Sequence, residues 1–322
     1  MPDLIEMRRL GRSDLMVPPL CLGGNVFGWT ADEPTSFGLL DALVDAGLTF
    51  IDTADVYSAW APGNTGGESE TIIGCWQKNR GVRDKIVIAT KVGWAAAPDG
   101  RHLSGPAIRA AVEASLRRLQ TDRIDLYISH KDDPDTPPEE TLQAHADLIR
   151  EGKVRAIGAS NYDADRLKQA LDVSARLSLP RYESLQPEYN LYDRAGYEAA
   201  LEPLCVEQGL GVTPYYGLAS GFLTGKYRSE ADFGQSERGQ RMDKYLNERG
   251  RRILAALDAV AAERGATPAQ IALAWLMARP SVTAPIASAT SVAQLQDLIA
   301  ATHLRLDGDA IERLDQASAP AA

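Results

Sequence analysis

Cysteine is scarce in this chain of 322 residues, which contains only Cys21, Cys75 and Cys205. An odd number of widely spaced cysteines fits neither a disulfide framework nor the paired spacing of a zinc site. The four histidines also lack the spacing of metal ligands. These absences predict a protein of a reducing compartment, the cytoplasm, without a bound metal.

Long apolar runs and an excess of positive charge are missing too. No stretch approaches the roughly 18 apolar residues that a membrane-spanning helix needs, and residues 1–14 lack the apolar core of a signal peptide. Lys and Arg number 34 against 44 Asp and Glu, so the net charge is -10, which disfavours nucleic acid as a partner. We therefore expect a soluble protein that acts on a small molecule, with no membrane or nucleic-acid partner.

Several familiar motifs are present only in incomplete form. Segment 23–28, GGNVFG, imitates a dinucleotide fingerprint, but Asn25 stands where the middle glycine is required. Segment 221–227, GFLTGKY, imitates a phosphate loop, yet it is one residue short and ends in tyrosine. No serine lies in a GxSxG elbow. The sequence thus argues against a Rossmann site, a Walker A site and acyl transfer by serine.

Three apolar runs near the start of the chain each finish on an ionisable residue. Asp52 follows the first run and is itself followed five residues later by Tyr57, while Lys91 and His130 end the next two runs. Parallel strands of a barrel place their carboxyl ends on one face, so we expect these four side chains to meet there. Tyrosine, with a pKa of about 10, donates a proton at neutral pH only with help, such as a cation that favours phenolate. The pattern predicts a site for proton transfer.

Apolar strands and amphipathic helices alternate along the whole chain. Strict alternation favours an α/β fold of the (β/α)8 TIM barrel type over a doubly wound sheet, here with an N-terminal β-hairpin and extra helices before the last strand and at the C-terminus. No linker rich in Pro, Gly or Ser divides the chain, so a single domain over residues 1–322 is expected. The expected strands are 20–25, 49–54, 86–91, 124–130, 154–160, 183–188, 210–216 and 283–288. The expected helices include 32–47, 67–80, 104–120, 138–151, 163–178, 194–208, 250–264 and 267–279.

Ordered motifs along nearly the whole chain resemble those of the aldo-keto reductase superfamily. They are FIDTADVY at 50–57, GESETIIG at 67–74, ATK at 89–91, DLYISH at 125–130, GASN at 158–161, LQPEYN at 185–190 and GFLTGKY at 221–227. The resemblance implies an oxidoreductase that interconverts carbonyls and alcohols with NADP(H), with NAD(H) as the alternative cofactor. It also implies a catalytic tetrad, carried here by Asp52, Tyr57, Lys91 and His130.

The four tetrad residues have distinct expected roles. Negative charge grows on the carbonyl oxygen when hydride arrives, so the site must supply a proton and stabilising dipoles there. Tyr57 is expected to be the proton donor, made more acidic by Lys91, which Asp52 holds in place. His130 is expected to orient the carbonyl oxygen. Each of these residues alone would more often be structural; their occurrence together favours catalysis.

The resemblance also implies where the cofactor binds. Ser160, Asn161 and Gln186 match groups that bond the nicotinamide carboxamide, and Tyr215 matches the ring that stacks on it, with core packing as the alternative. The loop 217–226 matches one that folds over the pyrophosphate, where small residues let the backbone approach phosphate. The expected cofactor-binding residues are Gly24, Asn25, Asp52, Ser160, Asn161, Gln186, Tyr215, Gly217, Leu218, Ser220, Gly225, Lys226, Ala287, Ser288, Thr290 and Gln294.

At the adenosine end the sequence departs from the family pattern. Many relatives carry a basic residue near Thr290 or Gln294 to hold the 2′-phosphate of NADP(H), and neither position is basic here. Hydroxyl groups of Ser288, Thr290 and Ser291, with amides at the start of the next helix, are expected to bind the phosphate instead. A comparison of Michaelis constants for NADPH and NADH decides between the two cofactors.

The substrate is less clearly indicated than the reaction. Trp29, Trp60 and Trp94 follow the first three barrel strands and either wall an apolar pocket or pack the loops. The polar segment 219–248 exceeds ordinary loop lengths and indicates a lid or binding loop. Two other functions stay open: a cofactor-binding regulatory barrel with little turnover, and an unrelated barrel lyase or isomerase. Turnover and a change of nicotinamide fluorescence distinguish them.

Overall fold

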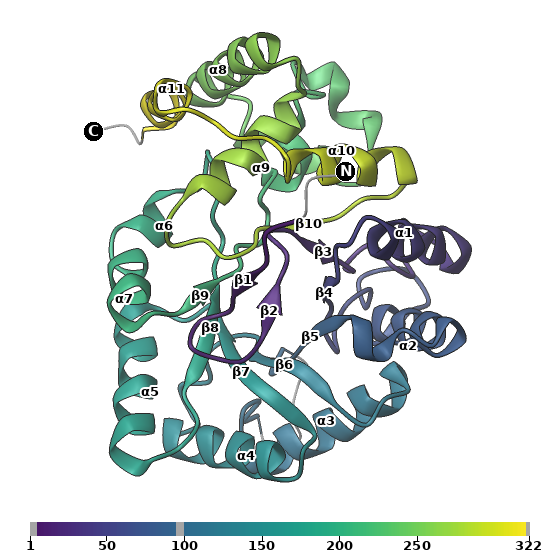
Figure 1. Cartoon of the computed structure of the whole chain (residues 1–322), viewed down its shortest axis with the longest axis vertical. Helices are drawn as coiled ribbons and strands as arrows, with labels where there is room; N and C mark the ends of the chain where they lie inside the picture. The colour runs from purple at the N-terminus through teal and green to yellow at the C-terminus, as the bar shows by residue number, and fades with distance from the viewer. Residues whose placement is uncertain (1–4, 95–99, 320–322) are drawn as a thin grey trace.

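A computed structural model describes residues 5–94 and 100–319 of the chain (Figure 1). Its central sheet has eight parallel strands in the order β10-β3-β4-β5-β6-β7-β8-β9. The strands are β3 (Cys21–Gly23), β4 (Phe50–Asp52), β5 (Val87–Val92), β6 (Ile124–Ser129), β7 (Val154–Ser160), β8 (Tyr182–Gln186), β9 (Gly211–Val212) and β10 (Ile286–Ala287). Each strand overlaps one of the eight segments that the sequence predicts.

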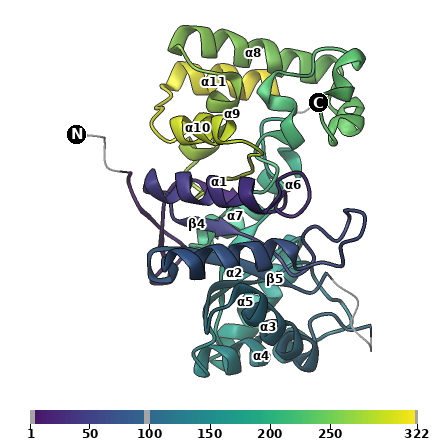
Figure 2. The same ribbon diagram turned by 90° about the vertical axis from the view of Figure 1, so that its right-hand side faces the viewer.

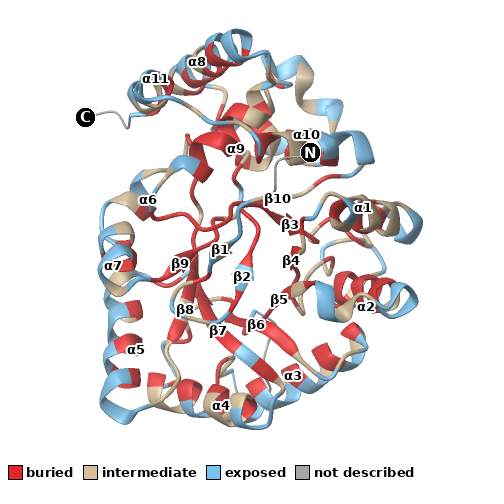
Figure 3. Cartoon of the chain, viewed as in Figure 1, coloured by how far each residue is buried: buried red, intermediate tan, exposed pale blue. Residues whose placement is uncertain are grey.

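The two edge strands of the sheet meet and close it. Val212 forms a parallel bridge with Val282. The amide of Thr283 donates to the carbonyl of Val212 at 2.8 Å, and the amide of Ile286 donates to the carbonyl of Pro214 at 2.8 Å. The fold is therefore the predicted (β/α)8 TIM barrel, with buried strands inside a ring of helices whose outer faces are exposed (Figure 3).

The last two barrel strands are shorter than the sequence predicts. Pro214 lies two residues beyond β9, and Pro285 directly precedes β10. Proline has no amide hydrogen to donate to a neighbouring strand, so regular pairing stops at these positions. The single hydrogen bonds around Pro214 then complete the closure.

An antiparallel hairpin precedes the barrel, as predicted. Its strands are β1 (Arg8–Arg9) and β2 (Met16–Val17). Leu10, Leu15 and Val17 are buried and pack with the inward-facing apolar residues of the barrel strands. The hairpin lies across the barrel in Figure 1 and closes one end of its interior.

Helices cover the outside of the barrel, and the predicted extra helices before the last strand and at the C-terminus are present. The helices are α1 (Glu33–Asp45), α2 (Glu68–Arg80), α3 (Gly105–Leu119), α4 (Pro138–Arg150), α5 (Ala164–Leu177), α6 (Ala195–Glu198), α7 (Leu201–Gln208), α8 (Glu248–Arg264), α9 (Pro268–Ala278), α10 (Val292–Ala301) and α11 (Gly308–Ser318), with a short 3₁₀ helix η1 (Arg83–Lys85). Figure 2 shows α8 and α11 stacked together at one end of the molecule.

The predicted helix 194–208 is wrong as a single element, because it is broken into α6 and α7 around Ala200. The backbone of Ala200 has φ -136°, outside the helical range. Pro203 explains the break, since a continuous helix would place its ring against the carbonyl four residues earlier. Restarting the helix at Leu201 puts Pro203 in the first turn, where no amide hydrogen bond is required.

The polar segment 219–248 is more ordered than a simple loop. Phe222, Tyr227, Met242 and Tyr245 within it are buried. These side chains hold the segment against the barrel, and the polar residues that dominate its composition lie on its outer side. The segment contains three 3₁₀ helices, η2 (Ala219–Thr224), η3 (Glu230–Gln235) and η4 (Gly239–Lys244).

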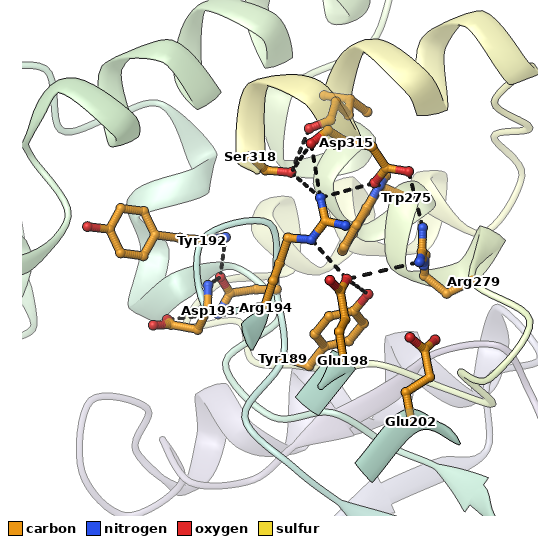
Figure 4. A network of polar contacts seen from close by, with 12 residues as sticks. Tyr189, Tyr192, Asp193, Arg194, Glu198, Glu202, Trp275, Arg279, Asp315 and Ser318 are labelled. Carbon is orange, nitrogen blue, oxygen red and sulfur yellow. Dashed lines mark hydrogen bonds and ion pairs between the residues drawn. The ribbon is translucent and has the colours of Figure 1, made fainter. Parts of the chain in front are cut away.

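A polar network ties the C-terminal helix to the barrel (Figure 4). The Arg194 guanidinium lies 5.4 Å from the ring centroid of Trp275 and donates to Ser318 Oγ at 2.7 Å. Trp275 Nε1 donates to Asp315 Oδ1 at 3.0 Å, and Arg279 pairs with the other oxygen of Asp315 at 3.2 Å. Helix α11 is thereby fixed to α6 and α9, away from the mouth of the barrel.

Candidate active site

The four residues of the predicted tetrad come together at the carboxyl end of the barrel. Asp52 ends β4, Lys91 lies in β5, His130 directly follows β6, and Tyr57 lies in the loop after β4. Lys91 Nζ is 2.8 Å from Asp52 Oδ2 and 2.7 Å from the Tyr57 hydroxyl. The Tyr57 hydroxyl is also 2.9 Å from Asp52 Oδ2, and its ring centroid lies 6.1 Å from that of His130.

Lys91 is completely buried, and each of its ammonium hydrogens has an acceptor. Nζ donates to Asp52 Oδ2, to the Tyr57 hydroxyl and to the carbonyl of Thr53, the last at 2.8 Å. Burial lowers the pKa of Lys91, and the charge of Asp52 opposes that shift. Three donors facing three acceptors fit the ammonium form.

Tyr57 does not show the lowered pKa that the sequence analysis expects from its neighbour Lys91. Burial raises the pKa of Tyr57 well above its ordinary value, and the charge and hydrogen bond of Asp52 raise it further. The shift is upward because burial of the phenol disfavours its charged form, and because the Asp52 carboxylate acts on Tyr57 as well as on Lys91. The phenol therefore keeps its proton at neutral pH, which is the form that a proton donor requires.

His130 is neutral in this environment. Burial lowers the pKa of His130 well below its ordinary value, and the charges of Lys91 and Lys131 lower it further. Its Nδ1 is buried and accepts or donates no hydrogen bond within the described part of the chain. The Trp94 ring lies 4.9 Å away, centroid to centroid. A neutral imidazole at this position is able to donate one hydrogen bond to an oxygen in the cavity.

Three amide and hydroxyl side chains form a connected group beside the tetrad. Gln186 Nε2 donates to Asp52 Oδ1 at 2.9 Å, and Ser160 Oγ donates to the carbonyl of Gln186 at 2.8 Å. Asn161 Nδ2 donates to the carbonyl of His130 at 2.8 Å, and the Tyr215 hydroxyl donates to Asn161 Oδ1 at 2.9 Å. The structure thus brings together the polar residues that the sequence predicts for the nicotinamide end.

The loop after β9 has an unusual backbone. Tyr216, Ala219 and Ser220 all have positive φ, at 54°, 46° and 57°. Side chains disfavour this region, so its repeated use indicates that the surrounding structure imposes the loop shape. Successive amides in such turns make concave sites that accept anions, and Lys226 adds a cation at the end of the loop.

One large cavity of about 1270 Å³ contains most of the predicted site residues. Of the tetrad, Asp52, Tyr57 and His130 line it, whereas the buried Lys91 lies beneath its floor. Cofactor residues predicted from the sequence that line it are Asn25, Asp52, Ser160, Asn161, Gln186, Tyr215, Gly217, Leu218, Ser220, Lys226, Ala287, Ser288, Thr290 and Gln294. The volume exceeds that of a site for one small ligand and suits an extended cofactor with a substrate.

Gly24 and Gly225 are predicted cofactor residues that do not line the cavity. The Gly24 amide donates to the carbonyl of Asp52 at 2.8 Å, and a Cβ there would lie 2.8 Å from Ser69 Oγ. A Cβ on Gly225 would lie 2.5 Å from a guanidinium nitrogen of Arg228. Close packing behind the site thus favours glycine at position 24, whereas Arg228 could move away from a side chain at position 225, where the φ of 79° favours glycine.

The far end of the cavity is closed by α10 and the start of α9. Ser288 Oγ donates to Asn25 Oδ1 at 2.6 Å, while Gln294 Oε1 accepts from both the amide and the hydroxyl of Thr290 at 2.9 and 3.1 Å. Asp297 also lines the cavity and accepts from Thr267 Oγ1 at 3.0 Å. The sequence analysis identified neither Asp297 nor Thr267 as a residue of the cavity lining.

Three tryptophans that the sequence proposes as pocket walls do line the cavity. Trp29 and Trp60 meet edge to face with centroids 5.8 Å apart, and Trp60 lies 6.0 Å from the Tyr57 ring. Trp94 lines the other side beside His130. The segment 234–238 of the polar stretch also lines the cavity, and no signal in the sequence singles out its individual residues.

The donor set of this cavity fits a nicotinamide dinucleotide. A Cβ on Gly23 would lie 2.6 Å from Ser288 Oγ, so β3 favours a glycine where it ends at the cavity wall. The cavity wall carries neutral amide side chains, an aromatic ring, a loop whose residues have positive φ, and Lys226. Within residues 5–94 and 100–319, no group of three metal-ligating side chains is found, and no helix is long and apolar enough to cross a bilayer.

The chain matches the model of the aldo/keto reductase family over residues 19–319. It is 37% identical over 319 residues to the uncharacterized oxidoreductase YrpG of Bacillus subtilis (strain 168), a match that covers 97% of this chain and 95% of that protein. It is 34% identical over 311 residues to the aldo-keto reductase YhdN of the same organism, covering 95% and 88%. It is also 34% identical over 299 residues to a probable voltage-gated potassium channel subunit beta of Oryza sativa subsp. japonica, covering 90% and 89%.

Proposed function

The chain belongs to the aldo/keto reductase family of oxidoreductases, and from this premise we propose that it interconverts an aldehyde or ketone and the corresponding alcohol with NADP(H). A nicotinamide cofactor bound in the cavity supplies or accepts the hydride. The observation that carries the proposal is the contact of 2.7 Å between Lys91 Nζ and the Tyr57 hydroxyl on the floor of that cavity. This contact gives a proton donor and a stabilising charge at one point.

Each tetrad residue has a defined task in this reaction. Tyr57 gives its proton to the carbonyl oxygen as negative charge develops there. The Lys91 ammonium stabilises the phenolate that remains, and Asp52 holds Lys91 through the 2.8 Å ion pair. His130, as a neutral imidazole, donates to the same oxygen and fixes its orientation. In the oxidation direction the Tyr57 phenolate takes the proton of the alcohol.

Replacing the proposed donor tests this assignment directly. Tyr57→Phe removes only the hydroxyl, so we expect kcat/KM for NADPH-dependent reduction of 4-nitrobenzaldehyde to fall by about 10³-fold, within the range for loss of a general acid. Cofactor binding, measured by nicotinamide fluorescence, is expected to stay unchanged. Equal rates in the variant and the wild type would falsify the assigned donor.

A matched control separates the chemistry from a general effect of losing a phenol. Tyr162 is also buried, and its hydroxyl contacts that of Tyr182 at 3.2 Å outside the cavity lining. Tyr162→Phe is expected to keep kcat/KM within about two-fold of the wild type, because no step of the reaction uses it.

We propose NADP(H) rather than NAD(H) as the cofactor. Support comes from the family resemblance and from the Thr290 amide and hydroxyl at the adenosine end, whereas Lys226 in the cavity lining would serve either cofactor. A phosphate at that end would take the place of Gln294 Oε1 as acceptor for both donors. Michaelis constants for NADPH and NADH with one aldehyde test the choice, and a clear preference for NADH contradicts it.

A second candidate function follows from the likeness to the potassium channel subunit of rice. In that case the barrel would bind the cofactor and a protein partner, with little turnover. The complete set of Asp52, Tyr57, Lys91 and His130 at contact distances favours the enzyme. Tight NADPH binding without reduction of any aldehyde, sugar or ketone in a substrate panel would favour the regulatory alternative.

A further inference from the structure

A second buried polar cluster lies directly behind the tetrad, outside the barrel wall. We call Asp55, Glu70, Thr90, Arg118 and Tyr127 the acid cluster; Glu70, Thr90 and Tyr127 are buried, whereas Asp55 and Arg118 are partly buried. Successive residues of a strand point to opposite faces, so Thr90 and Tyr127 face the helices α2 and α3, while their strand neighbours face the barrel interior. The tetrad and this cluster are therefore separated by one thickness of the sheet.

Glu70 of α2 is fixed at the centre of the cluster. Its side chain has no exposed surface. Oε1 accepts from Thr90 Oγ1 at 2.6 Å, and Oε2 accepts from Arg118 Nε of α3 at 2.6 Å. With both oxygens accepting and a guanidinium beside one of them, Glu70 has the bonding of a carboxylate.

Asp55 has fewer hydrogen-bond partners than Glu70, with the Val56 amide as a donor to its carboxyl group. Its Oδ1 is buried and has no hydrogen-bond partner in the described chain, and the same holds for the Tyr127 hydroxyl. Burial and then the charge of Glu70 raise the pKa of Asp55 to about 7, while Arg118 and Lys91 oppose the shift. An ionised Asp55 would face the Glu70 carboxylate without any donor of its own at Oδ1, so the neutral acid is favoured up to neutral pH.

Asp55 is coupled to the tetrad through Lys91. It lies in the short segment between Asp52 and Tyr57, and its amide donates to the carbonyl of Lys91 at 3.4 Å. A negative charge on Asp55 raises the pKa of Lys91, which means that it acts on the ammonium group. Lys91 in turn contacts the Tyr57 hydroxyl. The reaction as proposed above makes no use of Asp55.

We propose that Asp55 is a positioning residue whose ionisation state controls how strongly Lys91 promotes proton donation by Tyr57. When Asp55 is neutral, the field of the Lys91 ammonium at Tyr57 is offset only by Asp52. When Asp55 ionises, a second negative charge offsets that field and disfavours the phenolate. The inference rests on the proposed carbonyl reductase function and adds a second titrating group to it.

Because ionisation of Asp55 should lower the rate, the dependence of kcat/KM on pH tests the proposal. For wild-type protein, kcat/KM for 4-nitrobenzaldehyde reduction with NADPH is expected to fall several-fold between pH 6 and pH 8, centred near 7. Asp55→Asn keeps the side chain neutral, so its profile is expected to stay at the acid-side value across this range. Asp135→Asn makes the same change at an exposed acid. It is expected to retain the wild-type step, which is the fall of kcat/KM between pH 6 and pH 8. Superimposable profiles of Asp55→Asn and the wild type overturn the proposal.

Changing the neighbour Glu70 provides a second variant. Glu70→Gln removes the charge that disfavours ionisation of Asp55, so the step in the rate profile is expected to move to lower pH. A merely structural role of the cluster would lower the rate at all pH values without moving the step. An unmoved step in Glu70→Gln therefore contradicts the inference.

An infrared titration tests the same group without turnover. The wild type is expected to show the C=O stretch of a buried protonated carboxyl group that disappears between pH 6 and pH 8 and is missing from Asp55→Asn. Absence of this band overturns the inference even if aldehydes are reduced. Presence of the band in a protein that reduces no carbonyl compound at any pH overturns the proposed function and leaves the titration of Asp55 standing.

Discussion

Two polar networks in this protein are built from similar residues but placed in different surroundings. The mouth network joins Lys91 and Asp52, whose side chains are 0% and 1% exposed. The shell network of Figure 4 joins Arg194 and Asp315, which are 11% and 30% exposed, with further partners on α6 and α9. Solvent reaches the second network and weakens each of its ion pairs, whereas the first has no such screening.

The difference between the networks separates function from stability. Burying an ion pair costs several kcal/mol in lost hydration, and its members often destabilise the fold relative to apolar residues. Burying Lys91 and Asp52 in contact with the Tyr57 hydroxyl nevertheless shifts the pKa values of Lys91 and Tyr57, and such shifts are typical of sites that carry out chemistry. In the shell network, Asp315 accepts from Trp275 and pairs with Arg194 and Arg279, and these contacts hold α11 in place. We expect substitutions to affect activity in the first network and stability alone in the second.

The largest effect is expected from Lys91→Met in the mouth network. Methionine fills a similar volume but leaves Asp52 buried without its cation, and it removes the charge that stabilises the Tyr57 phenolate. We expect kcat/KM to fall by about 10³-fold, or about 4 kcal/mol, and the free energy of unfolding to fall by about 3 kcal/mol. Steady-state kinetics and urea unfolding measure the two quantities.

Adding a second substitution sharpens the interpretation of Lys91→Met. The double variant Lys91→Met with Asp52→Asn removes both charges, so much of the lost stability is expected to return. Activity is expected to stay low, because no cation remains near Tyr57. Recovery of activity in the double variant would show that Lys91 acts only by neutralising Asp52.

His145 offers an intermediate case, a buried base outside both networks. Its Nε2 lies 3.2 Å from Ser129 Oγ, and burial lowers the pKa of His145 to about 4. In the unfolded chain His145 has the ordinary histidine pKa of about 6.5. Between pH 6.5 and 4 the unfolded chain therefore binds a proton at His145 that the folded protein does not bind. Stability from this group is thus complete above pH 6.5 and falls as the pH drops, by at most about 3 kcal/mol.

Urea unfolding at pH 7.5 and 4.5 measures this dependence on pH. His145→Gln cannot titrate, so the difference between the two pH values is expected to be smaller in the variant than in the wild type. Asp55 contributes with the opposite sign, because its raised pKa makes the folded protein bind the extra proton. An equal pH difference in the variant and the wild type would show that His145 does not titrate as its burial implies.

Much of the mouth network could be predicted because its position follows from chain order. Asp52, Lys91 and His130 each end a strand, and parallel strands of a barrel bring those ends to one face. The raised pKa of Tyr57 was not predicted, since it depends first on how deeply Tyr57 itself is buried and then on the charge of Asp52, and a sequence does not give depth. The role proposed for Asp55 was not anticipated for the same reason.

Of the other features that the sequence analysis missed, one was predictable from the sequence and the others were not. The break between α6 and α7 is predictable from Pro203, because proline is tolerated in the first turn of a helix and not in its interior. The cavity-lining segment 234–238 was not predictable residue by residue, since the end of a short 3₁₀ helix and the connection that follows it show neither the helical nor the strand period of apolar residues. Partners such as Arg194 and Ser318 are distant in sequence, so only the pair of Arg194 with Glu198, four residues later, has a local signature.

The smallest effect is expected from Asp315→Asn in the shell network. The asparagine amide would keep an acceptor for Trp275 Nε1 but lose the charge that faces Arg194 and Arg279. We expect the free energy of unfolding to fall by about 1 to 2 kcal/mol, because these pairs are only partly exposed and two guanidinium groups lose a partner. The rate of aldehyde reduction is expected to stay unchanged.

A control on the same helix isolates the effect of this network. Glu312→Gln removes an equal charge from an exposed position of α11, and we expect a change within about 0.5 kcal/mol. Equal stability of the two variants would mean that the shell network contributes no more than an ordinary surface charge. A loss of activity in Asp315→Asn would mean instead that the position of α11 is transmitted to the barrel mouth through α9, and the separation of the two networks would fail.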